Sequence, residues 1–184
     1  MVELEEEQGW ISQSQQGDPV AFEALVTRYQ HMMHALTFRM TGSLADADDL
    51  TQETFIQAFR QLSSYRAEAR FSSWLYRIAV NRCLNWKKRK ERQERLHTDW
   101  GRQLETADVP DIKRMQQVQD ALMKLNPKQR AAVILTTYDG LNHAEAARTL
   151  GCSETTVSWR LFAARAKLKK MLTRQQEKEA HCDE

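Results

Sequence analysis

Residues 143–172 read HAEAARTLGCSETTVSWRLFAARAKLKKML and predict two helices joined by a tight turn. A short helix over His143–Leu150 leads into Gly151-Cys152-Ser153, and a longer helix follows over Glu154–Leu172. The glycine supplies the backbone freedom that the turn needs, and the small Ala147 lets the two helices pack closely at a steep angle. This arrangement is typical of a helix-turn-helix, in which the second helix enters the major groove of DNA with its N-terminus first.

The second helix of this motif carries the hydroxyls, the indole ring and the cations that suit contact with DNA. We expect side chains of its first turns to face bases or phosphates, and a later cation to hold the DNA backbone. The expected set is Ser153, Thr155, Thr156, Ser158, Trp159, Arg160 and Arg165. An ordinary helical hairpin with a basic solvent face is the alternative, and the concentration of basic residues on the second helix disfavours it.

Amphipathic helices fill most of the remaining sequence, because apolar residues recur at intervals of three and four. In the C-terminal half, a helix begins near Ile112, Asn126-Pro127 ends it and begins another, and Asp139-Gly140 forms a turn. In the N-terminal half, helices begin at Asp18-Pro19 and at Ser43, each with a side chain suited to capping. A third helix, rich in aromatic residues, follows a polar stretch.

The apolar periodicity fails between Gln93 and Asp111, which indicates a linker. We therefore expect an all-α fold, with two small helical domains joined by a flexible linker and the helix-turn-helix in the second. The expected ranges are 1–92 for the first domain, 93–111 for the linker, 112–174 for the second domain and 175–184 for a polar tail.

Charge is unevenly distributed along the 184 residues, although the formal net charge is only +2. Residues 1–23 contain six acids and no Lys or Arg, and a second acidic cluster lies over Asp46–Glu53. Basic residues gather in Arg77–Arg95 and again in Arg160–Arg174. Two basic segments predict two contacts with a polyanion, and the acidic cluster predicts a surface that binds another protein.

Several classes of protein are disfavoured by composition. No apolar run reaches the roughly eighteen residues that a membrane-spanning helix needs, and the acidic N-terminus is unlike a secretory signal. Cys83, Cys152 and Cys182 are odd in number and far apart, which predicts reduced thiols in a cytosolic protein. The histidines are scattered and no catalytic or phosphate-binding motif is present. We expect no enzyme, no cofactor and no metal site.

A second candidate site lies over Tyr65–Arg77, where aromatic residues alternate with arginines; Asn81, Asn85 and the run Lys87–Lys90 follow it. This pattern suits single-stranded nucleic acid, because rings stack on bases, amides read base edges and cations neutralise phosphates. The alternative is a packing role. Trp74 and its apolar neighbours are equally suited to a core, and we expect at least half of these aromatic residues to be buried.

Several stretches together resemble the sigma-70 family of RNA polymerase sigma factors, in its extracytoplasmic-function group. GDPVAFEAL (residues 17–25), DADDLTQETF (46–55) and FSSWLYRIAVN (71–81) are similar to the first conserved domain of that family. LNPKQR (125–130) and the helix-turn-helix are similar to its promoter −35-reading domain. The likeness covers residues from about 10 to 172 and implies a promoter-reading subunit that works when docked on RNA polymerase.

The resemblance implies a role for three sets of residues. The set implied to dock on the clamp helices of the largest polymerase subunits is Asp48, Asp49, Gln52, Glu53 and Phe55. The set expected at the −10 element is Tyr65, Arg66, Trp74, Tyr76, Arg77, Asn81, Asn85, Lys87 and Lys88. Within it, the loop Tyr65–Phe71 is implied to capture a flipped base of the non-template strand. At the −35 element the resemblance adds Phe162 to the helix-turn-helix residues named above.

The chain also departs from the family's pattern. Its short linker implies that it lacks the middle domain of larger factors. The indole of Trp159 stands where relatives often carry a small polar residue, which changes either base-edge contact or packing. The promoter sequence therefore cannot be transferred from relatives.

The partners implied by the resemblance are core RNA polymerase, promoter DNA and an anti-sigma factor wedged between the domains, in the bacterial cytoplasm. Two other classes stay open on the residues alone. A stand-alone helix-turn-helix regulator would bind duplex DNA by itself. A helical adaptor that binds only proteins is the third class, and the basic second helix of the motif argues against it.

Overall fold

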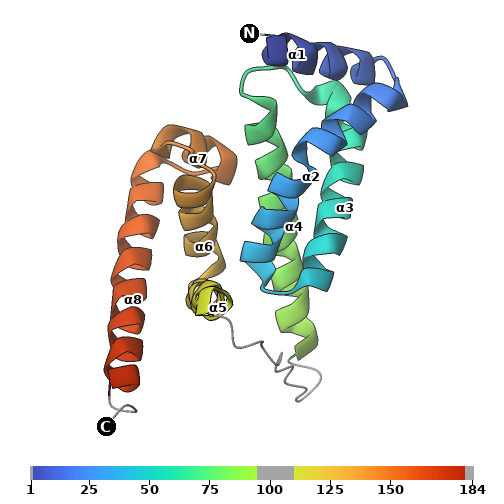
Figure 1. Ribbon diagram of the computed structural model, residues 1–184. Coiled ribbons are helices and arrows are strands. Elements are labelled where there is room, and N and C mark those ends of the chain that lie inside the picture. The colour runs from blue at the N-terminus through green and yellow to red at the C-terminus, as the bar shows by residue number, and fades with distance from the viewer. Residues whose placement is uncertain (1, 95–109, 181–184) are drawn as a thin grey trace. The chain divides into compact units, whose positions relative to one another are not determined.

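The computed structural model describes residues 2–94 and 110–180 of the chain (Figure 1). These residues form helices, turns and loops without any strand, which confirms the all-α prediction. The chain divides into two compact units, Met1–Phe38 with Ser43–Cys83 and Arg39–Gly42 with Leu84–Glu184. Most of the predicted linker, residues 95–109, lies outside the described part of the chain.

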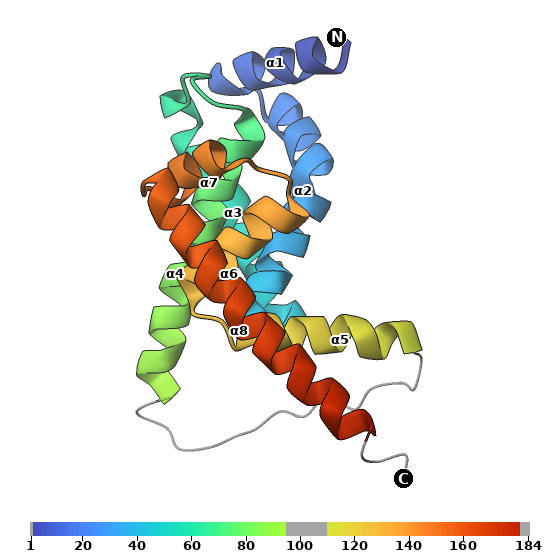
Figure 2. The same ribbon diagram turned by 90° about the vertical axis from the view of Figure 1, so that its left-hand side faces the viewer.

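The first unit is a helical bundle. It contains α1 (Val2–Gln15), most of α2 (Pro19–Thr41), α3 (Leu44–Gln61), the short 3₁₀ turn η1 (Leu62–Ser64) and the first part of α4 (Phe71–Glu94), which continues from Leu84 into the second unit. Helices α2, α3 and α4 run side by side, and α1 lies across one end of them (Figure 1, Figure 2). The core between them includes the buried side chains Leu25, Met33, Leu36, Leu50, Ala58, Leu75 and Ala79.

Local capping explains where α2 and α3 begin. The backbone N–H of Val20 donates to Asp18 Oδ1 at 2.8 Å, and the backbone N–H of Asp46 donates to Ser43 Oγ at 3.3 Å. Each cap satisfies an N–H group that has no partner inside the first turn of a helix. Both helix starts are those that the sequence predicted.

Helix α1 is an element that the sequence pattern did not predict. Its sequence is rich in acids and glutamines, yet Ile11 and Ser14 on one side of the helix are buried and only 8% and 5% exposed. Ser14 Oγ donates to the carbonyl of Trp10 at 2.6 Å, and so its hydroxyl is satisfied within the helix.

The second unit holds the helix-turn-helix. Its elements are α5 (Pro110–Met123), α6 (Pro127–Val133), the π-helical turn η2 (Ile134–Tyr138), α7 (His143–Leu150) and α8 (Glu154–Ala180). Helix α8 contacts α5, α6 and α7 (Figure 2). Its core includes the buried side chains Ala131, Ile134, Leu135, Ala146, Val157, Leu161 and Ala164.

The caps of α7 confirm the helix-turn-helix prediction at both ends. Asn142 and Glu145 form a reciprocal capping box, with N–H···O distances of 2.9 and 3.0 Å. At the other end Gly151 adopts the left-handed conformation, with φ of 60°, which a residue without Cβ takes at little cost.

A buried arginine ties α6 to the end of α5. The guanidinium of Arg130 donates to the carbonyls of Leu122 at 2.8 Å, Met123 at 2.7 Å and Leu125 at 3.2 Å. Carbonyls in the last turn of a helix have no partner within that helix, so this side chain supplies one from the next element. Lys167 Nζ of α8 donates to one further carbonyl just after α5, that of Lys124, at 2.6 Å.

Helix α8 is longer than predicted. It continues to Ala180, beyond the expected end at Leu172 and into the predicted polar tail. The sequence TRQQEKEA over residues 173–180 contains no glycine or proline and is rich in good helix formers, which explains the extension.

Candidate functional site

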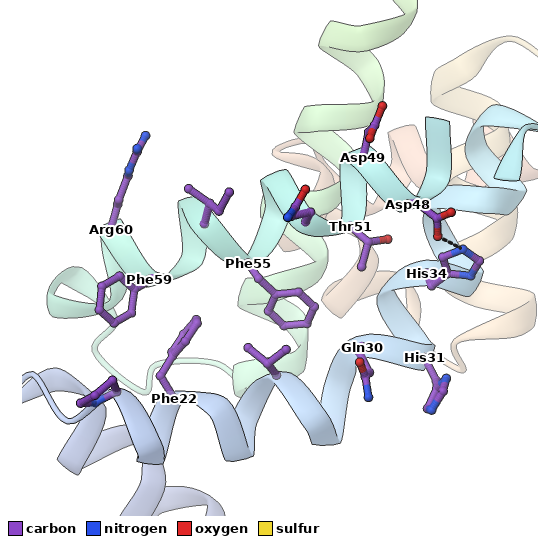
Figure 3. A pocket seen from close by; sticks show the side chains of 14 residues that line it. Phe22, Gln30, His31, His34, Asp48, Asp49, Thr51, Phe55, Phe59 and Arg60 are labelled. Carbon is purple, nitrogen blue, oxygen red and sulfur yellow. Dashed lines mark ion pairs between the residues drawn. The ribbon is translucent and has the colours of Figure 1, made fainter. Parts of the chain in front are cut away.

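A groove of about 960 Å³ lies between α2 and α3 (Figure 3). The predicted docking residues Asp48, Asp49, Gln52 and Phe55 line it. The amphipathic pattern of α3 brings them there, because positions three and four residues apart share a helix face. The structure thus brings together four of the five residues that the resemblance assigned to a protein-binding surface.

One end of this groove is lined by two aromatic residues that the predicted docking set did not include. Phe22 of α2 and Phe59 of α3 pack edge to face, with ring centroids 5.0 Å apart (Figure 3). Phe59 is 48% exposed and the neighbouring Ile56 is 47% exposed. The signal that could have found them is the position of Phe59, four residues after Phe55 on the same helix face.

The other end of the groove is polar. His34 Nε2 lies 2.9 Å from Asp48 Oδ1, and this pair joins α2 to α3 (Figure 3). Asp48 remains largely exposed and Asp49 is exposed beside it. A partner that fills this groove would meet an apolar end and an acidic end, so it would need both apolar and basic side chains.

Glu53 lies apart from the other predicted docking residues. Its Oε2 is 3.5 Å from Arg82 Nη1 of α4, and Arg82 Nη2 also donates to Gln57 Oε1 at 2.6 Å. Glu53 is not among the residues that line the groove. Its carboxylate therefore joins α3 to α4.

A cluster of aromatic side chains lies where the loop after η1 enters α4. The ring of Tyr65 packs against Phe71 and Trp74 with centroid distances of 5.4 and 5.3 Å, and Phe71 also packs on Tyr29 of α2 at 5.5 Å. Phe71 is buried, whereas Tyr65 and Trp74 are half-buried. The half-buried rings leave part of their surface for stacking.

The phenols of this cluster stay protonated at neutral pH. Burial raises the pKa of Tyr65, and the negative charge of Glu7 raises it further. Burial and the hydrogen bond to Glu7 also raise the pKa of Tyr29. Tyr65 Oη donates to the carbonyl of Ala69 at 2.7 Å, a hydrogen bond between two residues of the same loop.

The predicted DNA residues of α4 fall into an exposed row and a buried member. Arg77, Asn81, Asn85 and Lys88 are exposed, and their spacing of three and four residues places them on one helix face. Tyr76 is 2% exposed and lies in the core. Lys87, also on α4, is partly buried, and its Nζ is 3.8 Å from Glu91 Oε1. Arg66, in the loop before α4, is exposed.

Helix α8 presents hydroxyls and rings on the side opposite its core contacts. Thr155, Trp159 and Phe162 follow one another at four and three residues, and Trp159 and Phe162 are 67% and 73% exposed. Their rings pack edge to face at 6.3 Å. Val157 and Leu161 form the buried side of the same turns. The two large rings therefore contribute little to the core.

Contacts within the turn hold the start of α8. Ser153 Oγ accepts from the backbone N–H of Thr156 at 3.2 Å, and Ser158 Oγ lies 3.1 Å from His143 Nδ1 of α7. Arg160 Nη1 donates to Cys152 Sγ at 3.4 Å and is half-buried, whereas Arg165 is exposed. This contact joins Arg160 to the turn.

The described residues include neither a membrane-spanning helix nor a metal-binding cluster. No helix among them is long and apolar enough to cross a membrane. They also hold no group of three or more His, Cys, Asp or Glu side chains arranged to bind a metal ion.

Both units match known families. Residues 25–93 match the family model described as Sigma-70 region 2, and residues 115–168 match Sigma-70, region 4. The chain is 37% identical to the ECF RNA polymerase sigma factor SigM of Mycobacterium tuberculosis (strain ATCC 25618 / H37Rv), over 85% of this chain and 79% of the relative. It is 34% identical to the ECF RNA polymerase sigma-E factor of Escherichia coli (strain K12), over 84% of this chain and 88% of the relative.

Solved structures agree with these matches. CnrH, solved in complex with the cytosolic domain of CnrY, superposes with a TM-score of 0.69 at 27% identity and covers 91% of this chain and 97% of its own. The sigma factor RpoE of Bartonella quintana, solved with the anti-sigma factor NepR, has a TM-score of 0.70 over 83% of this chain and 96% of its own, and at 22% identity it supports the fold.

Proposed function

The chain belongs to the sigma-70 family of RNA polymerase sigma factors, in its extracytoplasmic-function group. On this premise we propose which of its surfaces bind polymerase, the −10 element and the −35 element. As a sigma factor it binds core RNA polymerase and directs the start of transcription at specific promoters. We propose that the chain supplies recognition and no catalytic group of its own.

The groove between α2 and α3 is the proposed docking surface for the polymerase clamp helices. Asp48, Asp49 and Gln52 line it and suit a partner helix that carries basic and polar side chains. Phe55 is 8% exposed, so it shapes the floor of the groove. Glu53 supports the surface indirectly, because its carboxylate pairs with Arg82 and holds α3 against α4.

The loop Tyr65–Phe71 is the proposed site that captures an extruded base of the −10 element. Stacking on the half-buried rings of Tyr65 and Trp74 would offset the few kcal/mol that unstacking a base costs. Arg66, exposed in the loop, and Lys87, in the basic run of α4, would neutralise nearby phosphates. Tyr76 is proposed to support α4 from the core.

The exposed row on α4 would follow the separated strand away from this loop. Its members are Arg77, Asn81, Asn85 and Lys88. Amides at two of these positions can bond base edges, and the cations at the other two neutralise phosphates.

The exposed face of α8 is the proposed −35 reader. Thr155, Ser158, Trp159 and Phe162 would meet base edges in the major groove, and Ser153 and Thr156 would position the helix start. Arg160 is held beside the turn by Cys152, which supports contact with phosphate more than with a base. Arg165, exposed one turn further along the helix, would also contact phosphate.

Domain roles follow from these surfaces. We assign polymerase docking and −10 recognition to residues 1–92, −35 recognition to residues 112–174, and a connecting role to residues 93–111. We also propose an anti-sigma factor as a partner, because RpoE of Bartonella quintana was solved with the anti-sigma factor NepR, and CnrH was solved with the cytosolic domain of CnrY. A chain that serves polymerase in this way would act in the cytoplasm.

A single observation carries the proposal: one chain holds both a region 2 unit with an aromatic, partly exposed loop and a region 4 helix-turn-helix. The test is run-off transcription by core RNA polymerase on a library of randomised promoters, with and without the chain. We expect chain-dependent transcripts that share two upstream elements at a fixed spacing. Transcripts independent of the chain, together with tight duplex binding by the chain alone, would instead identify a stand-alone regulator.

A further inference from the structure

The last residue of α1 reaches the entrance of the loop that we assign to base capture. Gln15 Nε2 donates to the carbonyl of Leu62 at 3.0 Å and to the carbonyl of Tyr65 at 2.9 Å. One carbonyl belongs to the first residue of η1 (Leu62–Ser64), and the other belongs to Tyr65, the first residue of the loop. One amide nitrogen carries two N–H groups, so a single side chain can serve both acceptors.

The loop itself has few other restraints. Arg66, Ala67 and Glu68 are exposed, so apolar packing does not fix them. Ala67 has a φ of 55°, a left-handed conformation that is uncommon for a residue with a Cβ. Such a backbone persists when surrounding contacts hold it, and the hydrogen bond from Tyr65 Oη to the carbonyl of Ala69 is one such contact.

Helix α1 also reaches the exit of the loop. Glu7 Oε2 accepts from Tyr29 Oη at 2.6 Å and lies 3.4 Å from Arg28 Nε. The ring of Tyr29 in turn packs on Phe71, the first residue of α4. One helix therefore supports both ends of the loop, directly through Gln15 and through a tyrosine at the other end.

We propose that α1 is a positioning element for base capture and that the Gln15 amide sets the geometry of the loop Tyr65–Phe71. This inference rests on the proposed function, and it gives Gln15 a positioning role in place of a direct contact with DNA or polymerase. Gln15 is absent from the lining of the docking groove, so its role is separable from polymerase binding.

Three variants test whether the N–H donors of the Gln15 amide hold the loop. Gln15→Glu keeps the size of the side chain but replaces the two donors with oxygens that only accept, which repel the two carbonyls. Gln15→Lys keeps donors, since an ammonium group carries three. Gln16→Glu is the matched control, because it places the same new charge at an exposed neighbouring glutamine.

The experiment measures binding of non-template −10 oligonucleotides to holoenzyme assembled with each variant. One oligonucleotide carries the captured base, defined by the selected promoters, and a second has an abasic site there. We expect Gln15→Glu to weaken binding of the first about tenfold and to leave binding of the second within about twofold. Gln15→Lys and Gln16→Glu should stay within about twofold of wild type on both.

Affinity for core polymerase and the thermal unfolding midpoint are measured on the same proteins, and we expect both to be unchanged in Gln15→Glu. Equal behaviour of Gln15→Glu and Gln16→Glu would overturn the role of Gln15. So would an equal loss on both oligonucleotides together with a lower unfolding midpoint, because that is the result of a purely structural role. A wild-type chain that directs no initiation would overturn the proposed function itself.

Discussion

At the scale of the residue, exposure decides between two readings of Trp159. An indole that packed into the core would be covered like its neighbour Val157, yet Trp159 is 67% exposed. Phe162 lies beside it and is even more exposed. Two large exposed rings on the outer face of a recognition helix fit apolar contact with thymine methyl groups, which only the major groove presents. We therefore propose that the indole of Trp159 contacts bases rather than the core.

This assignment predicts that promoters selected by the chain carry thymine in the −35 element, and that its methyl group matters. Replacing that thymine with deoxyuridine removes one methyl group and keeps the base pair. We expect holoenzyme binding to fall about fourfold, because burying one methyl-sized group contributes about 0.8 kcal/mol. Competition between the two duplexes measures the change.

Trp159→Ser supplies the comparison for that measurement, since serine is small and polar. With this variant the thymine and deoxyuridine promoters should bind equally. An equal loss for the wild-type and Trp159→Ser proteins would show that another residue contacts the methyl group.

At the scale of the element, caps made the helix-turn-helix predictable. The sequence signal for its end is Gly151, and the observed bounds of α7 equal the predicted ones. Helix α1 had no such signal, because its fixing contacts reach far along the chain, from Gln15 to Leu62 and from Glu7 to Tyr29. The apolar periodicity of a segment shows which face of its helix is apolar. It does not identify hydrogen-bond partners that lie far away in the sequence.

The candidate site was predictable to a similar degree. The resemblance to the family assigned Asp48, Asp49 and Gln52 to one docking surface, and in the structure they line the groove. It did not separate Arg77, which is exposed, from Tyr76 beside it, which is buried. Burial depends on which neighbouring helix covers a position, and that is decided by tertiary packing.

The capping box of α7 gives a prediction at this scale. Asn142→Ala removes the acceptor for the backbone N–H of Glu145, and we expect the free energy of unfolding to fall by about 1 kcal/mol. Urea titration of the full chain, followed by circular dichroism, measures it. Asn142→Asp keeps the acceptor oxygen and should stay close to wild type. Equal stability of Asn142→Ala and Asn142→Asp would mean that the box contributes nothing measurable.

At the scale of the whole molecule, one chain carries two readers with different substrates. The region 2 unit offers half-buried rings that suit an unpaired base, and the region 4 unit offers a helix that suits the major groove of a duplex. Because the readers share a chain, binding by one raises the local concentration of DNA at the other. A promoter with both elements should therefore be preferred over one with either alone.

The most direct test of this division is permanganate reactivity of thymines at a selected promoter, because permanganate oxidises unpaired thymines faster than paired ones. With core polymerase and the chain together, we expect reactive thymines in the −10 element and unreactive thymines in the −35 element. Core polymerase alone and the chain alone should leave both elements unreactive. Unreactive −10 thymines at a promoter that the chain binds tightly as duplex by itself would contradict the account.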